Sequence, residues 1–236
     1  MNNYILPNDP EFISNLILQK TGYFLKLGGA QALMNWNMYG DKEGLVKFLE
    51  ENNFQKVFLD LVFSELVREY KVIRSLIADE NLDRIISIGP GNGLLELLLL
   101  KEGLTSEILL IDIENTDYHY HGFSDKGSGY ADLESTKNFI ELNLSTYVAI
   151  KCCNPYKQDI PDFSFSLLIS LLSMGFHYPC SEYSNYILKN SKHSSLVILD
   201  KRLSTEDKGY QELQEFFFPI HQIQSPKSNR MFLARR

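Results

Sequence analysis

The sequence of 236 residues predicts an α/β fold: a doubly wound, mostly parallel sheet with an antiparallel last strand and an N-terminal helical cap. Three patterns support this prediction. Residues 1–80 show only helical spacing of apolar residues, residues 84–202 alternate apolar strands with helices, and a glycine-rich junction joins the first strand to the next helix. We therefore expect a helical cap over residues 1–80 and a ligand-binding domain over residues 81–236.

The N-terminal part contains the longest helical pattern of the chain. From Phe54 to Ile77, apolar residues recur at intervals of three and four, as expected of a helix that buries one face. Shorter helices are expected before it, separated by glycines, at Glu11–Lys20, Gln31–Tyr39 and Lys42–Asn52.

Strands and helices alternate from residue 84 onward. The strand runs are almost continuously apolar, which is typical of a parallel sheet covered on both faces. Strands are expected at 84–88, 108–113, 147–152, 165–172 and 195–200, with helices at 93–102, 133–144 and 181–190. Two further strands, 216–222 and 230–234, are joined by the hairpin-like segment 224–229, so the last strand is expected to run antiparallel.

The glycine-rich junction is the strongest functional signal. An Ile-rich run from Arg84 ends in Gly89, Gly91 and Gly93, and a leucine-rich helical pattern follows at once. Glycine adopts positive φ and has no Cβ, so this turn can bring the backbone and a helix N-terminus close to a ligand. The dinucleotide fingerprint G-x-G-x-x-G would need glycine where Leu94 stands. The junction therefore predicts a nucleoside-binding site, with S-adenosylmethionine favoured over NAD.

Polar residues at the ends of the following strands are candidates for the same site, because ligands in such sheets bind at the carboxyl ends of strands. Asp112 lies 23 residues after Gly89, where a carboxylate can accept hydrogen bonds from both ribose hydroxyls. Glu114 is the alternative ribose ligand. Asn154 can pair with an adenine edge or simply begin an Asn-Pro turn. Ser170 ends the fourth strand and is assigned to the cofactor site as well.

The segment Gly175-Phe-His-Tyr-Pro179, just beyond the fourth strand, supplies the candidate catalytic residues. His177 can take a proton from a substrate hydroxyl near neutral pH, and Tyr178 stands beside it. The other interpretation is a histidine that only holds its loop in place. His119 and His121 are the competing pair, but no third ligand lies nearby, so no metal site is predicted.

From Arg84 to Arg202 the chain resembles class I S-adenosylmethionine-dependent methyltransferases, which have a Rossmann-like fold. The junction Gly89–Gly93 is similar to the first motif of that family, and Asp112 to its ribose-binding acid. Residues 159–170 resemble the connection into the family's fourth strand.

Two positions depart from the family's pattern. Ser87 stands where the family often has an acid that contacts the methionine amino group, and Ser166 stands where an aspartate usually follows the aromatic residue. The segments 175–179 and 120–123 further resemble bacterial sugar O-methyltransferases. This second resemblance implies an acceptor hydroxyl on a sugar or another small polar metabolite.

Together these resemblances imply an enzyme that binds S-adenosylmethionine and a small-molecule substrate, with S-adenosylhomocysteine as its product. In the cap, Trp36 and Tyr39 are expected to lie over the strand ends, where they would bind substrate and exclude water. Three alternatives stay open: an acceptor of another kind, such as a phosphorylated small molecule or an amine; an NAD-dependent oxidoreductase; and a non-catalytic protein that keeps the fold.

Composition and charge narrow the choice of partners and location. A net charge of −7 and a pI of about 5.3 give no long-range attraction to nucleic acid or to an anionic membrane, and neither is an expected partner. The three cysteines form no disulfide framework. The N-terminus lacks a signal-peptide pattern, and the longest apolar run, 94–100, is far too short to span a bilayer, so a cytoplasmic location is expected.

Overall fold

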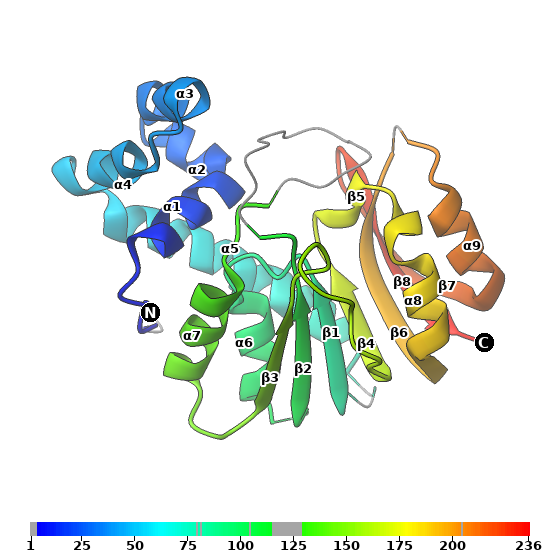
Figure 1. The fold of residues 1–236 in the computed structure, drawn as a ribbon. Helices are drawn as coiled ribbons and strands as arrows, with labels where there is room; N and C mark the ends of the chain where they lie inside the picture. The colour runs from blue at the N-terminus through cyan, green and yellow to red at the C-terminus, as the bar shows by residue number, and fades with distance from the viewer. Residues whose placement is uncertain (1–3, 79, 81, 104, 115–128, 204) are drawn as a thin grey trace.

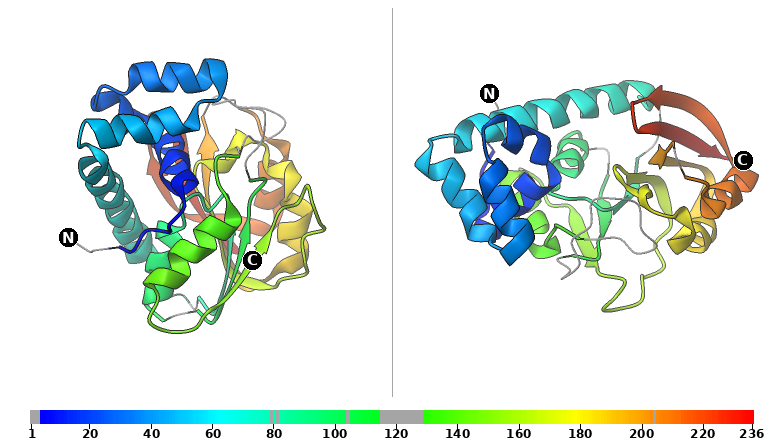
Figure 2. Two further views of the ribbon diagram at one scale, coloured as in Figure 1. Left: turned by 60° about the vertical axis from the view of Figure 1, so that its left-hand side comes forward. Right: turned by 90° about the horizontal axis from the view of Figure 1, so that it is seen from above.

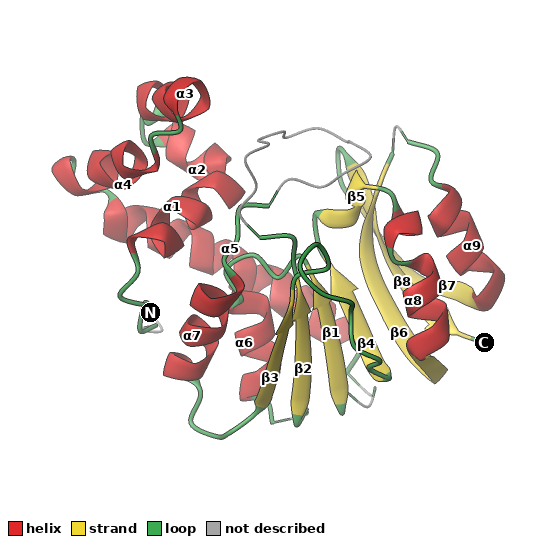
Figure 3. Ribbon diagram, in the orientation of Figure 1, coloured by secondary structure: helices red, strands yellow, loops and turns green. Residues whose placement is uncertain are grey.

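The computed structural model describes residues 4–236 except 79, 81, 104, 115–128 and 204; it places a twisted sheet between layers of helices (Figures 1 and 3). The first five helices are α1 (Pro10–Gln19), α2 (Thr21–Lys26), α3 (Ala30–Tyr39), α4 (Lys42–Glu51) and α5 (Gln55–Leu76). The strands are β1 (Arg84–Ile88), β2 (Glu107–Ile111), β3 (Ala149–Cys153), β4 (Phe165–Ser170), β5 (Ser173–Tyr178), β6 (Ser191–Arg202), β7 (Phe217–Gln224) and β8 (Ser228–Arg235). The later helices are α6 (Leu94–Lys101), α7 (Leu133–Asn143), α8 (Ser184–Asn190) and α9 (Lys208–Phe216), with a short 3₁₀ turn, η1 (Cys180–Glu182).

Seven strands form one sheet in the order β3-β2-β1-β4-β6-β8-β7. The first five in this order pair in parallel, β8 runs antiparallel to β6, and β7 runs antiparallel to β8. The predicted doubly wound, mostly parallel sheet with an antiparallel last strand is confirmed. The chain winds outward from β1 to β3 and then crosses to β4, so the winding reverses between β1 and β4. Ligands in open α/β sheets bind outside the strand ends at such a switch point.

Alternate residues of the central strands enter two separate apolar clusters. Ile85 and Ile108 are buried with residues of α5, α6 and α7, whereas Ile86 and Leu109 are buried with residues of α8 and α9. Successive side chains of a strand point to opposite faces, so each cluster lies on one face of the sheet. This two-sided burial explains why the strands are almost continuously apolar.

Helix α5 joins the N-terminal helices to the sheet. Its buried residues Phe58, Val62 and Ile73 belong to the same apolar cluster as Ile85 of β1 and Phe232 of β8. Figure 2 shows α5 extending from the group α1–α4 to the sheet edge formed by β7 and β8. Apolar packing is therefore continuous across residue 80, where the sequence analysis divides the chain.

Aspartate side chains fix the beginnings of four helices. Each accepts a backbone N–H of the first helical turn at 2.7–3.1 Å, which satisfies a donor that the helix itself leaves unpaired. These residues are Asp9 (α1), Asp41 (α4), Asp132 (α7) and Asp207 (α9).

Three elements differ from the sequence prediction. Helices α2 and α9 have apolar stripes too short for the periodicity to reveal, and neither is predicted. Residues 173–178, predicted as a loop, form β5, which lies next to β6 and outside the seven-stranded order. Met174, Phe176 and Tyr178 are buried, a period of two that Gly175 and Pro179 obscure in the sequence. Within the described residues, none of the helices combines the length and the apolar character needed to cross a membrane.

Candidate functional site

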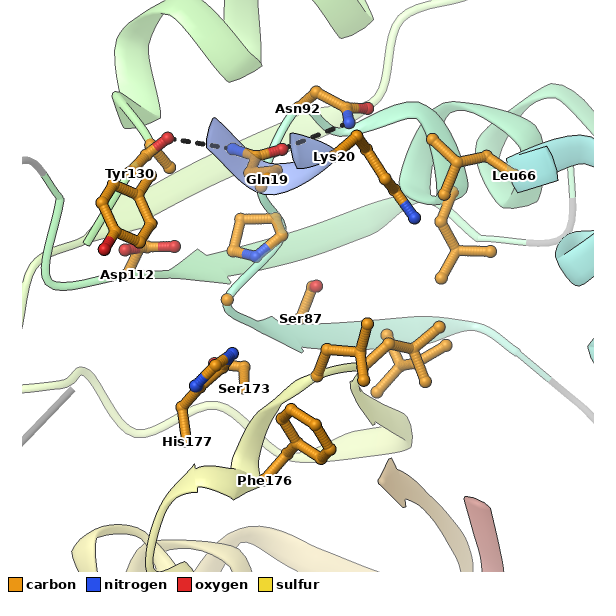
Figure 4. A pocket seen from close by; sticks show the side chains of 18 of the residues that line it. Gln19, Lys20, Leu66, Ser87, Asn92, Asp112, Tyr130, Ser173, Phe176 and His177 are labelled. Atoms are coloured by element: carbon orange, nitrogen blue, oxygen red, sulfur yellow. Dashed lines mark hydrogen bonds between the residues drawn. The ribbon is translucent and has the colours of Figure 1, made fainter. Parts of the chain in front are cut away.

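A cavity of about 640 Å³ lies at the switch point between β1 and β4 (Figure 4). Its lining comes from the loop after β1, the residues after β2, the β4–β5 region, the end of α1, one face of α5 and the β7–β8 turn. The volume is within the range of roughly 300–1,000 Å³ that is usual for small-molecule sites. Segments far apart in the sequence therefore converge where the topology predicts a ligand.

The three glycines after β1 all have positive φ: +71° at Gly89, +59° at Gly91 and +77° at Gly93. Gly89 and Gly91 line the cavity, whereas Gly93 is the N-cap of α6 and lies outside the lining. A Cβ on Gly89 would come within 2.2 Å of Ser173 Oγ, and one on Gly93 within 2.8 Å of Thr136 Cγ2. Glycine is therefore required by packing and backbone conformation in this loop, in addition to any contact with a ligand.

The two acids after β2 have different surroundings. Asp112 lines the cavity, and its Oδ1 accepts the backbone N–H of Glu114 at 2.9 Å. Burial, together with the negative charge of Glu114, raises the pKa of Asp112 to about 6. Glu114 lies outside the lining and accepts from Asn154 (2.6 Å) and Lys157 (2.7 Å). Although burial opposes it, these contacts hold the pKa of Glu114 below its usual range. Of the two acids, only Asp112 faces the cavity.

Asn154 and Ser170 do not line the cavity. Asn154 donates to the carbonyl oxygen of Ile113 (3.1 Å) and to Glu114, so it fixes the chain after β2. The buried Ser170 accepts the backbone N–H of Met174 at 3.0 Å and thereby shapes the turn between β4 and β5. In the described structure both side chains are engaged in holding loops that border the site.

Glu96 is a site residue that sequence reasoning missed. It lies in the first turn of α6, is 2% exposed and lines the cavity. Ser87 donates its hydroxyl to Glu96 Oε1 at 2.6 Å, and Oε2 has no hydrogen-bond partner among the described residues. The available signal was a charged residue within the run of leucines from 94 to 100, since glutamate is rarely buried without a partner.

His177 and Tyr178 both line the cavity, and the structure places them on β5. In Figure 4, His177 and Ser173 stand on one wall, while Asp112 stands on the opposite wall. The ring of His177 meets the ring of Phe176 edge-on, with centroids 4.9 Å apart. The hydroxyl of Tyr178 shares a hydrogen bond of 2.9 Å with Ser173, and burial raises the pKa of this phenol well above its usual value. The protonated phenol of Tyr178 is therefore favoured, and in this form it can donate or accept a hydrogen bond at the cavity wall.

Helix α1 brings the cap to the cavity through Gln19. Its Nε2 donates to the carbonyl oxygen of Tyr130 (2.9 Å), and its Oε1 accepts from Asn92 Nδ2 (3.3 Å), as Figure 4 shows. One cap side chain thus bridges the glycine loop and the segment that precedes α7. A glutamine at a helix end carries no distinguishing sequence signal, and it was not predicted.

Trp36 and Tyr39 do not line the cavity. Trp36 is 1% exposed and packs edge-on against Tyr130, with ring centroids 5.9 Å apart. Because Tyr130 itself lines the cavity, Trp36 supports the wall from behind. Tyr39 is 75% exposed. Aromatic content alone does not distinguish a core side chain from a substrate contact, which explains the difference from the expectation.

An ion network centred on the buried Asp200 supports the part of the cavity wall that includes Leu172. Asp200, 1% exposed, accepts from Nε and Nη2 of Arg230 at 2.8 Å each, and Nη2 also lies 2.7 Å from Glu69. Asp200 also accepts the N–H of Leu172, which has a φ of +51°. Against the effect of burial, the two acids raise the pKa of Arg230 above its usual value. The network therefore ties α5, β6 and β8 to a turn whose Leu172 lines the cavity.

Other predicted groups lie elsewhere. His119 and His121, and the segment 120–123, fall outside the described residues. Within the part of the chain that the structure describes, no group of three or more His, Cys, Asp or Glu side chains is arranged to hold a metal ion. The three cysteines are free thiols, and Cys153 and Cys180 are buried.

Known proteins resemble this chain in structure but not in sequence. No protein-family model matches the chain, and no curated protein matches its sequence. The N-methyltransferase NodS from Bradyrhizobium japonicum, solved in complex with S-adenosyl-L-homocysteine, aligns with a TM-score of 0.50 at 10% identity, over 72% of this chain and 86% of that one. The protein yhhF from Escherichia coli, assigned to the methyltransferases, aligns with a TM-score of 0.52 at 11% identity, over 72% of this chain and 84% of that one.

This chain has the Rossmann-like methyltransferase fold. Identities of 10–11% establish the fold alone, because one fold carries many reactions.

Proposed function

We propose that the protein is an S-adenosylmethionine-dependent methyltransferase that transfers the methyl group to an oxygen of a sugar or another small polar metabolite. The observation that carries this proposal is the convergence of the glycine loop, Asp112 and His177 on one cavity at the switch point of the sheet. The resemblance of residues 175–179 to sugar O-methyltransferases supports the choice of acceptor.

The residues present fit this cofactor. Gly89 and Gly91 bring the backbone of the glycine loop to the cavity lining, where a cofactor could contact it, and the carboxyl of Asp112 suits the two ribose hydroxyls. When bound, S-adenosylmethionine supplies a methyl group on a positively charged sulfur. Asp112 and Glu96 place two acidic side chains around the cavity, which favours a ligand that carries positive charge.

The reaction needs an oxygen of the acceptor aligned with the methyl group. With cofactor and acceptor bound, an imidazole nitrogen of His177 would take the proton of the acceptor hydroxyl as that oxygen receives the methyl group from the sulfur. Tyr178, held by Ser173, positions the wall on which His177 stands. Enclosure by the cap side chain Gln19 adds orientation and excludes water, and much of the acceleration comes from positioning.

The cavity also carries side chains that suit a polar acceptor. Lys20, Glu69 and Lys227 line it together with the ring of Phe176. Lys20 is paired with Glu65 at 3.0 Å, and Glu69 with Arg230, so their positions are defined before a substrate arrives. Charged and hydroxyl-bearing groups can hydrogen-bond a sugar while the aromatic ring packs on its carbon face.

Binding measurements test the cofactor. We expect isothermal titration calorimetry to detect binding of S-adenosylhomocysteine and none of NAD. The melting temperature should rise with the logarithm of the S-adenosylhomocysteine concentration above its dissociation constant. Binding of NAD alone would favour the oxidoreductase, and binding of neither would favour a non-catalytic protein. Transfer of a labelled methyl group to sugars, phosphorylated metabolites and amines, compared in one assay, then tests the acceptor.

Asp112→Asn is expected to weaken S-adenosylhomocysteine by about 1–3 kcal/mol, the usual worth of hydrogen bonds to a charged group. Glu114→Gln is the matched control, because Glu114 faces Asn154 and Lys157 instead of the cavity, and its affinity should stay close to wild type. Calorimetry of both variants at pH 7.5 gives the comparison. A larger loss in Glu114→Gln would move the ribose contact to that residue.

A further inference from the structure

Glu96 is a buried acid with an unexplained free oxygen. Its Oε1 is held by Ser87, while Oε2, which has no partner in the described structure, belongs to a side chain that lines the cavity beside the glycine loop. A buried carboxylate oxygen without a partner costs free energy, so such a group is kept where a ligand completes it.

No cation of the described structure is paired with this carboxyl. Lys20 contacts Glu65, Arg230 contacts Asp200 and Glu69, and Lys227 is exposed on the β7–β8 turn. Burial accordingly raises the pKa of Glu96 to about 7, against hydrogen bonds from Ser87 and from its own backbone. Near neutral pH the free protein therefore holds this carboxyl partly protonated.

The hydroxyl of Ser87 orients the carboxyl of Glu96 by donating a hydrogen bond to it. Ser87 of β1 lines the cavity together with Glu96, and its hydroxyl carries no charge. Here the negative charge lies on the first turn of α6 instead, one hydrogen bond of 2.6 Å away, and the helix N-terminus favours it.

We propose that Glu96, oriented by Ser87, is the carboxylate that receives the ammonium group of the bound cofactor. This inference rests on the proposed function. Ammonium binding requires the ionised carboxylate, so the cofactor displaces the proton that Glu96 holds, and binding near pH 7 releases a proton to solvent. The other ionisable groups that line the cavity are Lys20, Glu69, Asp112, Tyr130, His177, Tyr178 and Lys227.

The test compares two ligands that differ in the group concerned. S-adenosylhomocysteine carries the ammonium group, whereas 5′-methylthioadenosine keeps the adenosine and the sulfur but lacks it. We expect Glu96→Gln to lower the affinity for S-adenosylhomocysteine by about 10- to 100-fold, and that for 5′-methylthioadenosine by less than about threefold. The double variant Ser87→Asp/Glu96→Gln, which places the acid on β1, one hydrogen bond from its original position, should recover much of the lost affinity.

The pH dependence provides a second measurement. Wild-type affinity for S-adenosylhomocysteine should rise between pH 6 and 8 more steeply than that of Glu96→Gln; Asp112 is common to both, so the difference isolates Glu96. Titrations at pH 7 in buffers of different ionisation enthalpy should show more proton release by the wild-type protein than by Glu96→Gln, because Asp112 is present in both.

Equal affinity of wild type and Glu96→Gln for S-adenosylhomocysteine, or equal proton release by the two proteins, would overturn the role of Glu96 while leaving the proposed function intact. A wild-type protein that binds neither ligand would instead overturn the proposed function. Thermal denaturation at pH 8 checks the fold, where Glu96→Gln should melt no lower than wild type because no charge has to stay buried.

Discussion

Replacing His177 with alanine should lower the rate of methyl transfer by about 10²–10⁴-fold, the usual contribution of a positioned proton acceptor. The affinity for S-adenosylhomocysteine should change by less than about threefold, because the glycine loop and Asp112 lie on other parts of the lining. Single-turnover kinetics with the identified acceptor, together with calorimetry, separate the two effects.

Tyr178→Phe is the matched control for His177→Ala. It removes the hydroxyl that pairs with Ser173 and leaves the imidazole in place, so its rate should fall far less. Near-normal turnover of a folded His177→Ala protein would eliminate the proton-acceptor role. A joint loss of stability and cofactor affinity would instead assign His177 to the architecture of β5.

Asp200→Ala should lower the free energy of unfolding by about 1–3 kcal/mol, because it leaves the charge of the partly buried Arg230 without its principal partner. It also removes the acceptor for the N–H of Leu172, whose positive φ is held by that contact. Urea denaturation followed by circular dichroism measures the loss.

The double variant Asp200→Leu/Arg230→Met removes both charges and distinguishes a charge effect from lost packing. Since replacing a whole buried ion pair by apolar groups is often nearly neutral, it should be markedly more stable than Asp200→Ala. Glu69→Gln, at the more exposed end of the network, should cost much less than Asp200→Ala. A double variant as unstable as Asp200→Ala would show that the packing and hydrogen bonds of the two side chains, and not an unpaired charge, account for the loss of stability.

The parts of the site that the sequence predicts are those that one local pattern specifies. Glycines at alternate positions after an apolar strand indicate the turn, and the end of the next strand indicates Asp112. No local pattern specifies Gln19 or Glu96 as a site residue. Gln19 is held by residues far away in the sequence, and Glu96 of α6 is held by Ser87 of β1. Trp36 shows the converse: an aromatic residue that composition favours as a ligand contact lies in the core behind Tyr130.

The strand β5 illustrates a second limit of the sequence. Gly175 and Pro179 are typical of a loop, yet Met174, Phe176 and Tyr178 are buried on one side against the rest of the fold. The local propensity of Gly175 and Pro179 favours a loop, whereas burial of the apolar side chains favours a strand. In this segment the burial outweighs the local propensity.

The position of α5 determines how the chain can be shortened. A fragment beginning at residue 81 would lack Phe58, Val62 and Ile73, which are buried in the same cluster as Ile85 and Ile108 of the sheet. Water would then reach a broad apolar face, a surface that promotes aggregation. It would also leave Arg230 without Glu69. Helix α5 therefore belongs structurally to the sheet domain, and any useful truncation must keep it.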